Sequence, residues 1–73
     1  GSLVNFLEES LEGDLAFFDN PEGRITHVGI VLNDHRILHA SGSVRVDTLD
    51  PSGIYNSDLN RHSHRLRLLK RII

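Results

Sequence analysis

Two β-rich runs on either side of a short cluster of turn-forming residues constrain this chain more than any other feature. The runs cover residues 26–32 and 36–41, and Asn33, Asp34 and His35 lie between them. Runs rich in β-formers that flank such a cluster are typical of a hairpin. The sequence therefore predicts two antiparallel strands joined by a tight loop.

The length of that loop decides which side chains share a face of the hairpin. A three-residue loop pairs Ile30 with Leu38 and places a set of apolar side chains on one face. These are Val28, Ile30, Leu32, Leu38 and Ala40. A two-residue loop would turn His39 onto that face, because side chains alternate strictly along a strand. Burying an imidazole among aliphatic groups without a partner is costly, so we predict the three-residue loop, with a left-handed His35 at its end.

The other face of the predicted hairpin carries two histidines. In this register Gly29 lies opposite His39, and His27 is a diagonal neighbour of His39, at roughly 7 Å or less. Because Gly29 has no side chain, we expect an open space between the two imidazoles. Such a pair could hold the base of a nucleophile, bind a metal ion, or be half-exposed surface.

Length and composition exclude several classes of protein. The 73 residues allow one small domain, which hides only about 60–65% of the surface of its unfolded chain. The absence of cysteine excludes disulfides and thiolate metal sites. No apolar run approaches the roughly 20 residues of a membrane span, and the net charge of −2 argues against a nucleic-acid partner. Acidic residues gather in the first third and basic residues at the end, so we predict that these segments meet and neutralise each other.

The rest of the sequence predicts short elements joined by loops. Residues 2–11 carry the apolar stripe of a short helix with Ser2 as its cap, although an irregular lead-in fits equally well. We expect strands at 15–18, 44–47 and the first half of 62–73, loop at 48–53, and one helical turn at 54–59. The predicted fold is α+β, with a mostly antiparallel sheet of about five strands. The apolar face of that sheet needs a covering layer that this sequence does not supply.

Three blocks of the sequence form a recognisable pattern. They are Gly-Asp-Leu-Ala-Phe-Phe at 13–18, Thr-His-Val-Gly-Ile-Val-Leu at 26–32, and Ile-Leu-His-Ala-Ser at 37–41. In order and spacing they resemble the C-terminal, β-sheet half of NlpC-type cell-wall cysteine peptidases, which belong to the papain-like superfamily. The resemblance covers roughly residues 4–73. It implies that residues 1–73 are part of one peptidase domain, the sheet half of a papain-like fold without its N-terminal helical layer.

The resemblance also implies roles for individual residues. His27 matches the catalytic histidine of the family, the base that pairs with a cysteine thiolate, and His39 matches the orienting residue of a Cys-His-His triad. Family members cleave the γ-D-glutamyl to diamino-acid bond of peptidoglycan stem peptides in the bacterial cell envelope, in the periplasm or outside the cell. Ser41 and Gly42, just past His39, would line the substrate cleft. No cofactor is implied.

The sequence departs from the family pattern at the nucleophile. The family's cysteine lies in an Asp-Cys-Ser-Gly block upstream of the first matching strand, and this chain has no cysteine. We therefore expect that an N-terminal half, from the same or a separate chain, supplies the thiol, and that this chain alone is inactive.

Two other functions are compatible with the histidines. One is a histidine-based metal-binding module, in which His62 and His64, as an H-x-H pair, join His27 and His39. The other is a non-catalytic module that binds wall peptides or a protein partner, although such a module has no chemical need to keep both His27 and His39. For His62 and His64 themselves, an exposed strand end is the simpler interpretation.

Overall fold

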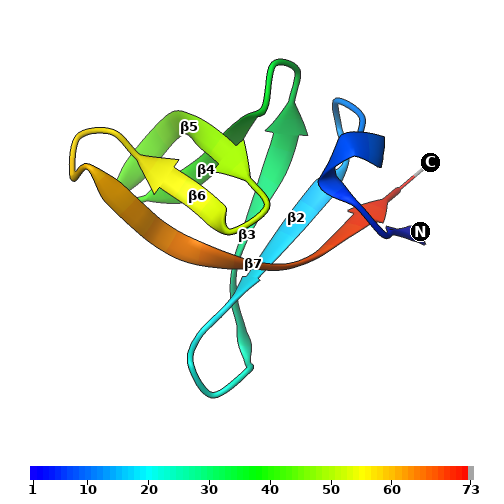
Figure 1. The fold of residues 1–73 in the computed structure, drawn as a ribbon, viewed down its shortest axis with the longest axis horizontal. Helices are drawn as coiled ribbons and strands as arrows, with labels where there is room; N and C mark the ends of the chain where they lie inside the picture. Colours follow the sequence, from blue (N-terminus) through cyan, green and yellow to red (C-terminus); the bar gives the residue numbers. More distant parts are fainter. Residues whose placement is uncertain (73) are drawn as a thin grey trace.

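Nearly all of the regular secondary structure of the protein is β-strand (Figure 1). The computed structural model describes residues 1–72. The elements are β1 (Ser2–Val4), the 3₁₀ helix η1 (Leu7–Glu9), β2 (Leu15–Asp19), β3 (Ile25–Leu32), β4 (Arg36–Ser41), β5 (Ser43–Asp50), β6 (Gly53–Asn56) and β7 (Arg61–Arg71). Within the described residues no helix has the length and apolar character needed to cross a membrane.

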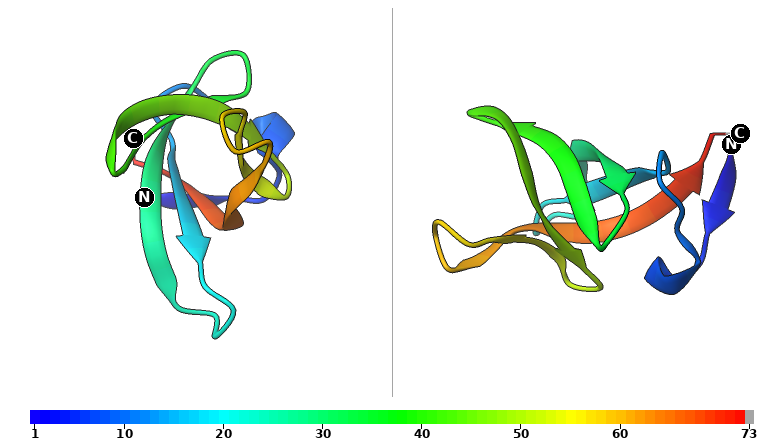
Figure 2. Two further views of the ribbon diagram at one scale, coloured as in Figure 1. Left: turned by 90° about the vertical axis from the view of Figure 1, so that its left-hand side faces the viewer. Right: turned by 90° about the horizontal axis from the view of Figure 1, so that it is seen from above.

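The strands form a closed barrel, so the predicted open α+β sheet of about five strands is wrong. Neighbouring strands from β2 to β7 pair antiparallel in chain order, and β7 pairs with β2 to close six strands into a ring. β1 pairs antiparallel with the C-terminal end of β7. In the left view of Figure 2 the strands curl around a common centre. The closure depends on β7, whose 11 residues reach β6 with one end and β2 with the other.

The predicted hairpin register is confirmed. Residues 33–35 form the loop between β3 and β4, and Gly29 lies opposite His39. His35 has the expected left-handed conformation, with a φ of 57°, and Asp34 shares it with a φ of 59°. Local turn chemistry therefore specifies how these two strands pair.

The hairpin buries the face that was expected to be exposed and exposes the face that was expected to be buried. The face that carries the histidines points into the barrel, where Val31 and Ile37 are buried. The apolar face lies outside, with Val28 47% and Ile30 42% exposed. Both faces of these strands carry aliphatic residues, so alternation alone does not tell which face lies inside. Because the barrel buries its own inner surface, its core needs no separate helical layer.

The buried apolar core fills one part of the barrel interior. Its members are Val4, Ala16, Phe18, Val31, Ile37, Leu49, Ile54 and Leu69. Among them Phe18, Ile37, Leu49 and Ile54 are the largest fully buried side chains. Phe18 lies between this core and the polar part of the interior described below, because its ring also contacts histidine rings.

Several local predictions need correction. The helix predicted at 2–11 is replaced by β1 and one 3₁₀ turn, and the helical turn predicted at 54–59 is replaced by β6. The predicted strand at 44–47 runs further, to Asp50, through the first half of the expected loop. The strand expected over the first half of 62–73 continues to Arg71. In each case strand pairing supplies the backbone hydrogen bonds, and this tertiary context overrides weak local propensity.

The acidic start and the basic end of the chain meet, as predicted. Asp14 accepts hydrogen bonds from Arg71 at 3.1 Å, and Asp19 accepts one from Arg65 at 2.8 Å. In each case the bond from arginine lowers the pKa of the carboxyl group, against the opposing effect of desolvation. These pairs link β7 to β2 and to the turn before it.

The space beside Gly29 is filled rather than open. A Cβ atom at this position would lie 2.6 Å from Cδ1 and 2.7 Å from Cγ1 of Ile37, a side chain that is fully buried. We therefore expect Gly29→Ala to lower the free energy of unfolding by about 1–3 kcal/mol, because overpacking forces the surrounding core to shift. Urea denaturation measures this loss. Gly29→Ala measured in an Ile37→Val background is the control, because valine lacks the Cδ1 atom that the added methyl group would meet. An equal loss of stability in the two backgrounds would contradict the prediction.

Candidate functional site: a histidine cluster in the barrel

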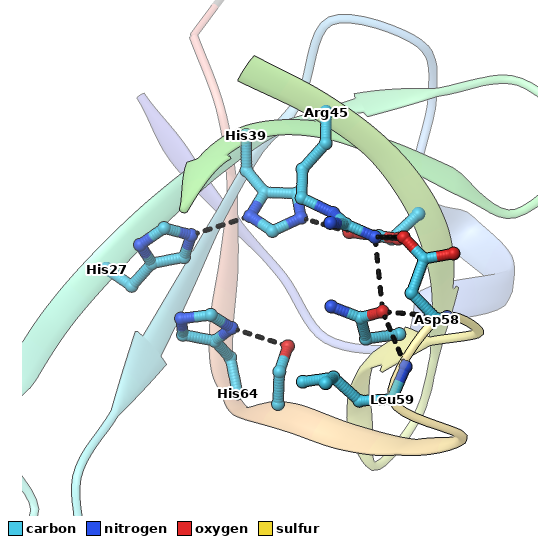
Figure 3. Close-up of polar contacts among 9 residues, drawn as sticks. His27, His39, Arg45, Asp58, Leu59 and His64 are labelled. Atoms are coloured by element: carbon cyan, nitrogen blue, oxygen red, sulfur yellow. Dashed lines mark hydrogen bonds and ion pairs between the residues drawn. The ribbon is translucent and has the colours of Figure 1, made fainter. Parts of the chain in front are cut away.

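Three histidines from three strands meet in the polar part of the barrel interior (Figure 3). They are His27 on β3, His39 on β4 and His64 on β7. Nε2 of His27 lies 2.9 Å from Nδ1 of His39, which is a hydrogen bond. The rings of His27 and His64 stack with centroids 4.0 Å apart and an interplanar angle of 19°. The barrel therefore places three imidazoles in direct contact.

The pairing of His27 with His39 follows from the hairpin register. Gly29 and His39 are direct partners, so His27 reaches His39 diagonally across the two strands. The predicted placement of both rings on one face is confirmed. His39 is buried, with 5% of its surface exposed, while His27 is partly buried.

A buried carboxylate holds the far side of His39. Oδ2 of Asp47 accepts a hydrogen bond from Nε2 of His39 at 2.7 Å. The guanidinium of Arg45 donates to both oxygens of Asp47, from Nε at 2.7 Å and from Nη2 at 3.0 Å. Chiefly through this bond, Arg45 lowers the pKa of Asp47 although burial acts in the opposite direction. Asp47 is therefore ionised at neutral pH.

Arg45 is itself held from a second side. Nη2 of Arg45 also donates to Oδ1 of Asn56 at 3.1 Å and to Oδ2 of Asp58 at 2.9 Å. A continuous chain of hydrogen bonds thus runs from the loop after β6, through Arg45, Asp47 and His39, to His27 (Figure 3).

The environment of His27 keeps its imidazole neutral. Burial lowers its pKa by desolvation, and the neighbouring His64 and His39 lower it further because they disfavour a second positive charge. The pKa of His64 is also lowered, mainly by desolvation. At neutral pH a neutral His27 can accept a proton, which is the requirement for a general base.

Replacing His64 should raise the pKa of His27. His64→Gln removes a group that can carry positive charge, and it opens one face of the His27 ring to water. Both effects favour the protonated form of His27. An NMR titration of the His27 ring measures the pKa. His62→Gln is the control, because His62 instead pairs with Asp50 at 2.7 Å. A His27 pKa that His64→Gln leaves unchanged would show that His64 does not act on His27.

Acid should destabilise the fold in two stages. The pKa values of His27 and His64 are lowered in the folded state, so the unfolded chain takes up protons first as the pH falls through about 6.5. Asp14, Asp19 and Asp47 also have lowered pKa values, so the stability they contribute is present above about pH 4 and is lost below it. Denaturation midpoints measured from pH 8 to pH 3 test this. Equal stability at pH 8 and pH 5 would contradict the first stage.

The predictions for the other candidate site residues have different outcomes. Ser41 and Gly42 lie at the end of β4 and in the turn after it, both exposed, and their role in substrate binding stays a prediction. His62 is exposed, as expected, and its nearest polar partner is Asp50. His64 does not lie at an exposed strand end, so that interpretation is wrong for it, and barrel closure is the reason.

Sequence reasoning missed Asp47 and Arg45, although a signal was present. Residues 44–47 alternate Val-Arg-Val-Asp, which places the two charged side chains on one face of the strand. That face is the one that His39 shares, since Arg45 pairs with His39 across β4 and β5. Once the register of this strand is known, Arg45 and Asp47 can be recognised as charged residues on the same face as the buried His39.

The three histidines are also the group that could hold a metal ion. One nitrogen from each of the three rings lies within 4.8 Å of the other two. Zinc accepts imidazole ligands, but their lone pairs must converge on the ion. The stacked rings of His27 and His64 direct their in-plane lone pairs side by side, so binding would require one ring to turn.

Comparison with known proteins identifies the family of this chain. The model of the NlpC/P60 family matches residues 4–65, a stretch that includes all three histidines and Asp47. No curated protein and no solved structure matches the chain. The matched stretch covers most of the sequence, so this chain belongs to the NlpC/P60 family, a family of cell-wall hydrolases of the peptidase type.

Proposed function

We propose that this chain carries the histidine part of a cysteine peptidase site, with His27 as general base and His39 as the residue that orients it. The observation that carries the proposal is the 2.9 Å bond from Nε2 of His27 to Nδ1 of His39, a buried residue. A base held by a second polar group is the arrangement that activates a thiol nucleophile. The lowered pKa of His27 supports the same role.

The thiol is proposed to come from protein outside these 73 residues, which contain no cysteine. In the first step His27 takes the thiol proton and the sulfur attacks the scissile carbonyl carbon. The tetrahedral intermediate then collapses, His27 gives the proton to the leaving amine, and an acyl-enzyme remains for water to hydrolyse. The proposed substrate is the γ-D-glutamyl to diamino-acid bond of peptidoglycan stem peptides, in the bacterial cell envelope. Ser41 and Gly42 are proposed to line the cleft.

An open groove beside the cluster supports access by a peptide. It is lined by Asp19, Asn20, Pro21, Thr26, Ser52, His62, Ser63, His64 and Arg65. His64 belongs both to this groove and to the histidine cluster, so a chain lying in the groove would run next to His27.

Hydrolysis of a γ-D-glutamyl-diaminopimelate peptide tests the proposal. We expect none from this chain alone, and thiol-dependent hydrolysis when the chain is produced with the gene sequence that precedes Gly1. In that protein His27→Gln should lower kcat by about 10²–10⁴-fold. His35→Gln, in the exposed loop between β3 and β4, is the control and should leave kcat unchanged. Hydrolysis by this chain alone, or equal activity of the two variants, would contradict the proposal.

A metal-binding module is the second candidate, and the cluster of three imidazoles is the observation that favours it. Zinc titration of the chain by calorimetry separates the two functions. One tightly bound ion that His64→Gln removes and His62→Gln retains would favour metal binding. No binding would leave the peptidase proposal as the better account.

A further inference from the structure

The protonation pattern of the histidine cluster is fixed from one end. An ionised carboxylate only accepts hydrogen bonds, so Nε2 of His39 must carry the hydrogen that it donates to Asp47. In its neutral form the His39 imidazole has one N–H, so in that form Nδ1 of His39 has a free lone pair. That nitrogen therefore accepts the bond from Nε2–H of His27. By the same rule, Nδ1 of a neutral His27 is unprotonated.

The unprotonated nitrogen of His27 is also the accessible one. Within residues 1–72, Nδ1 of His27 has no hydrogen-bond partner. The described residues contain no buried side-chain nitrogen or oxygen that lacks a partner, so this Nδ1 must be in contact with solvent. An incoming thiol can therefore reach the nitrogen that is free to accept its proton.

We propose that Asp47, held by Arg45, is a positioning residue that acts through His39 to make Nδ1 of His27 the proton-accepting nitrogen. This rests on the proposed function, because it assigns the base atom of that site. Asp47 is buried, and both of its oxygens are bound, so it cannot turn away from His39 without losing its bonds to Arg45. Arg45 in turn has its own partners in Asn56 and Asp58.

Ring nitrogens are read directly by ¹H–¹⁵N correlation spectra of the labelled chain at neutral pH. In the unmodified protein we expect a protonated Nε2 and an unprotonated Nδ1 in both His27 and His39. The two Nε2 protons should exchange slowly with water. A His39 ring protonated at Nδ1 would overturn the proposal, and this measurement needs no variant.

Asp47→Leu removes the acceptor while keeping a side chain of similar size. We expect the slowly exchanging Nε2 protons of both His39 and His27 to be lost. Asp58→Leu is the matched control, because it removes an exposed carboxylate from the same arginine. It should leave both protons in place. Unchanged protons in Asp47→Leu, or their loss in both variants, would overturn the proposal.

Asp47→Asn serves if the leucine variant does not fold. Its amide oxygen keeps the hydrogen bond without the charge, so we expect the Nε2 proton of His39 to exchange about tenfold faster. An unchanged rate would overturn the proposal. None of these spectra depends on peptide hydrolysis. If this chain shows the expected ring protons and the longer protein has no thiol-dependent peptidase activity, the proposed function is contradicted and the assigned base nitrogen stands.

Discussion

Gly53→Ala is expected to lower the free energy of unfolding by about 3 kcal/mol or more, a large part of the roughly 4–11 kcal/mol typical of a domain this size. Gly53 has a φ of 145°, which side chains of L-residues rarely adopt. A Cβ atom there would also overlap the backbone carbonyl of His64 on β7. The added methyl group would push β6 away from β7 at the point where the barrel closes.

Thermal and urea denaturation measure this loss, and Gly23→Ala is the matched control. Gly23 also has a positive φ, 81°, but a Cβ atom there meets nothing within 4 Å. Its replacement therefore adds backbone strain without a steric clash. If the Gly53→Ala and Gly23→Ala proteins are equally stable, the close approach of β6 to β7 at Gly53 is not needed for the stability of the barrel.

The same substitution should also reach the histidine cluster. His64 lies on β7 directly opposite Ile54, the residue after Gly53. If β7 moves away from β6, the stacked rings of His64 and His27 separate. In any folded fraction of Gly53→Ala, the pKa of His27 should then rise toward its usual value, because its burial and the neighbouring His64 both lower it.

The sequence could predict the local features of the hairpin, but it could not predict that the barrel closes. The hairpin register was predictable because loop length and alternation are local, and they correctly placed His27 and His39 on one face. The sequence could not predict which face of the hairpin points into the barrel, because both faces carry aliphatic side chains. The choice depends on β7 pairing with β2 and β6, contacts between residues far apart in the sequence. The position of His64 inside the barrel was not predictable for the same reason, although the sequence had named it as a candidate metal ligand.

The charged part of the site shows a second kind of difficulty. Asp47 and Arg45 were readable as one face of an alternating strand, yet their meaning depends on which histidine lies opposite them. A charged face on a short strand ordinarily indicates solvent exposure. Here the barrel turns that face inward, and the carboxylate is retained there by a bidentate arginine and a histidine. The charged face of this strand could therefore be recognised as part of a functional site only after the topology showed that it points into the barrel.

Phe18→Ala is expected to be the most damaging change in the core, with a loss of about 3–5 kcal/mol. The Phe18 ring is fully buried, and its centroid lies 5.8 Å from that of His27 and 6.0 Å from that of His64. Removing it leaves a cavity between the apolar core and the histidine cluster. Phe17→Ala, at the neighbouring and less buried position, is the matched control and should cost less. Urea denaturation compares the two.

The site should respond to the loss of Phe18 in a specific direction. Desolvation is the main cause of the lowered pKa of His27, so water that enters the cavity should raise that pKa. Phe18→Leu keeps the protein folded for this measurement, because it removes less volume, and we expect a smaller rise in the same direction. Phe17→Ala should leave the pKa of His27 where it is. If Phe18→Leu destabilises the barrel without moving that pKa, then the apolar core and the base of the proposed peptidase are independent, and the neutrality of His27 must come from its neighbouring imidazoles instead.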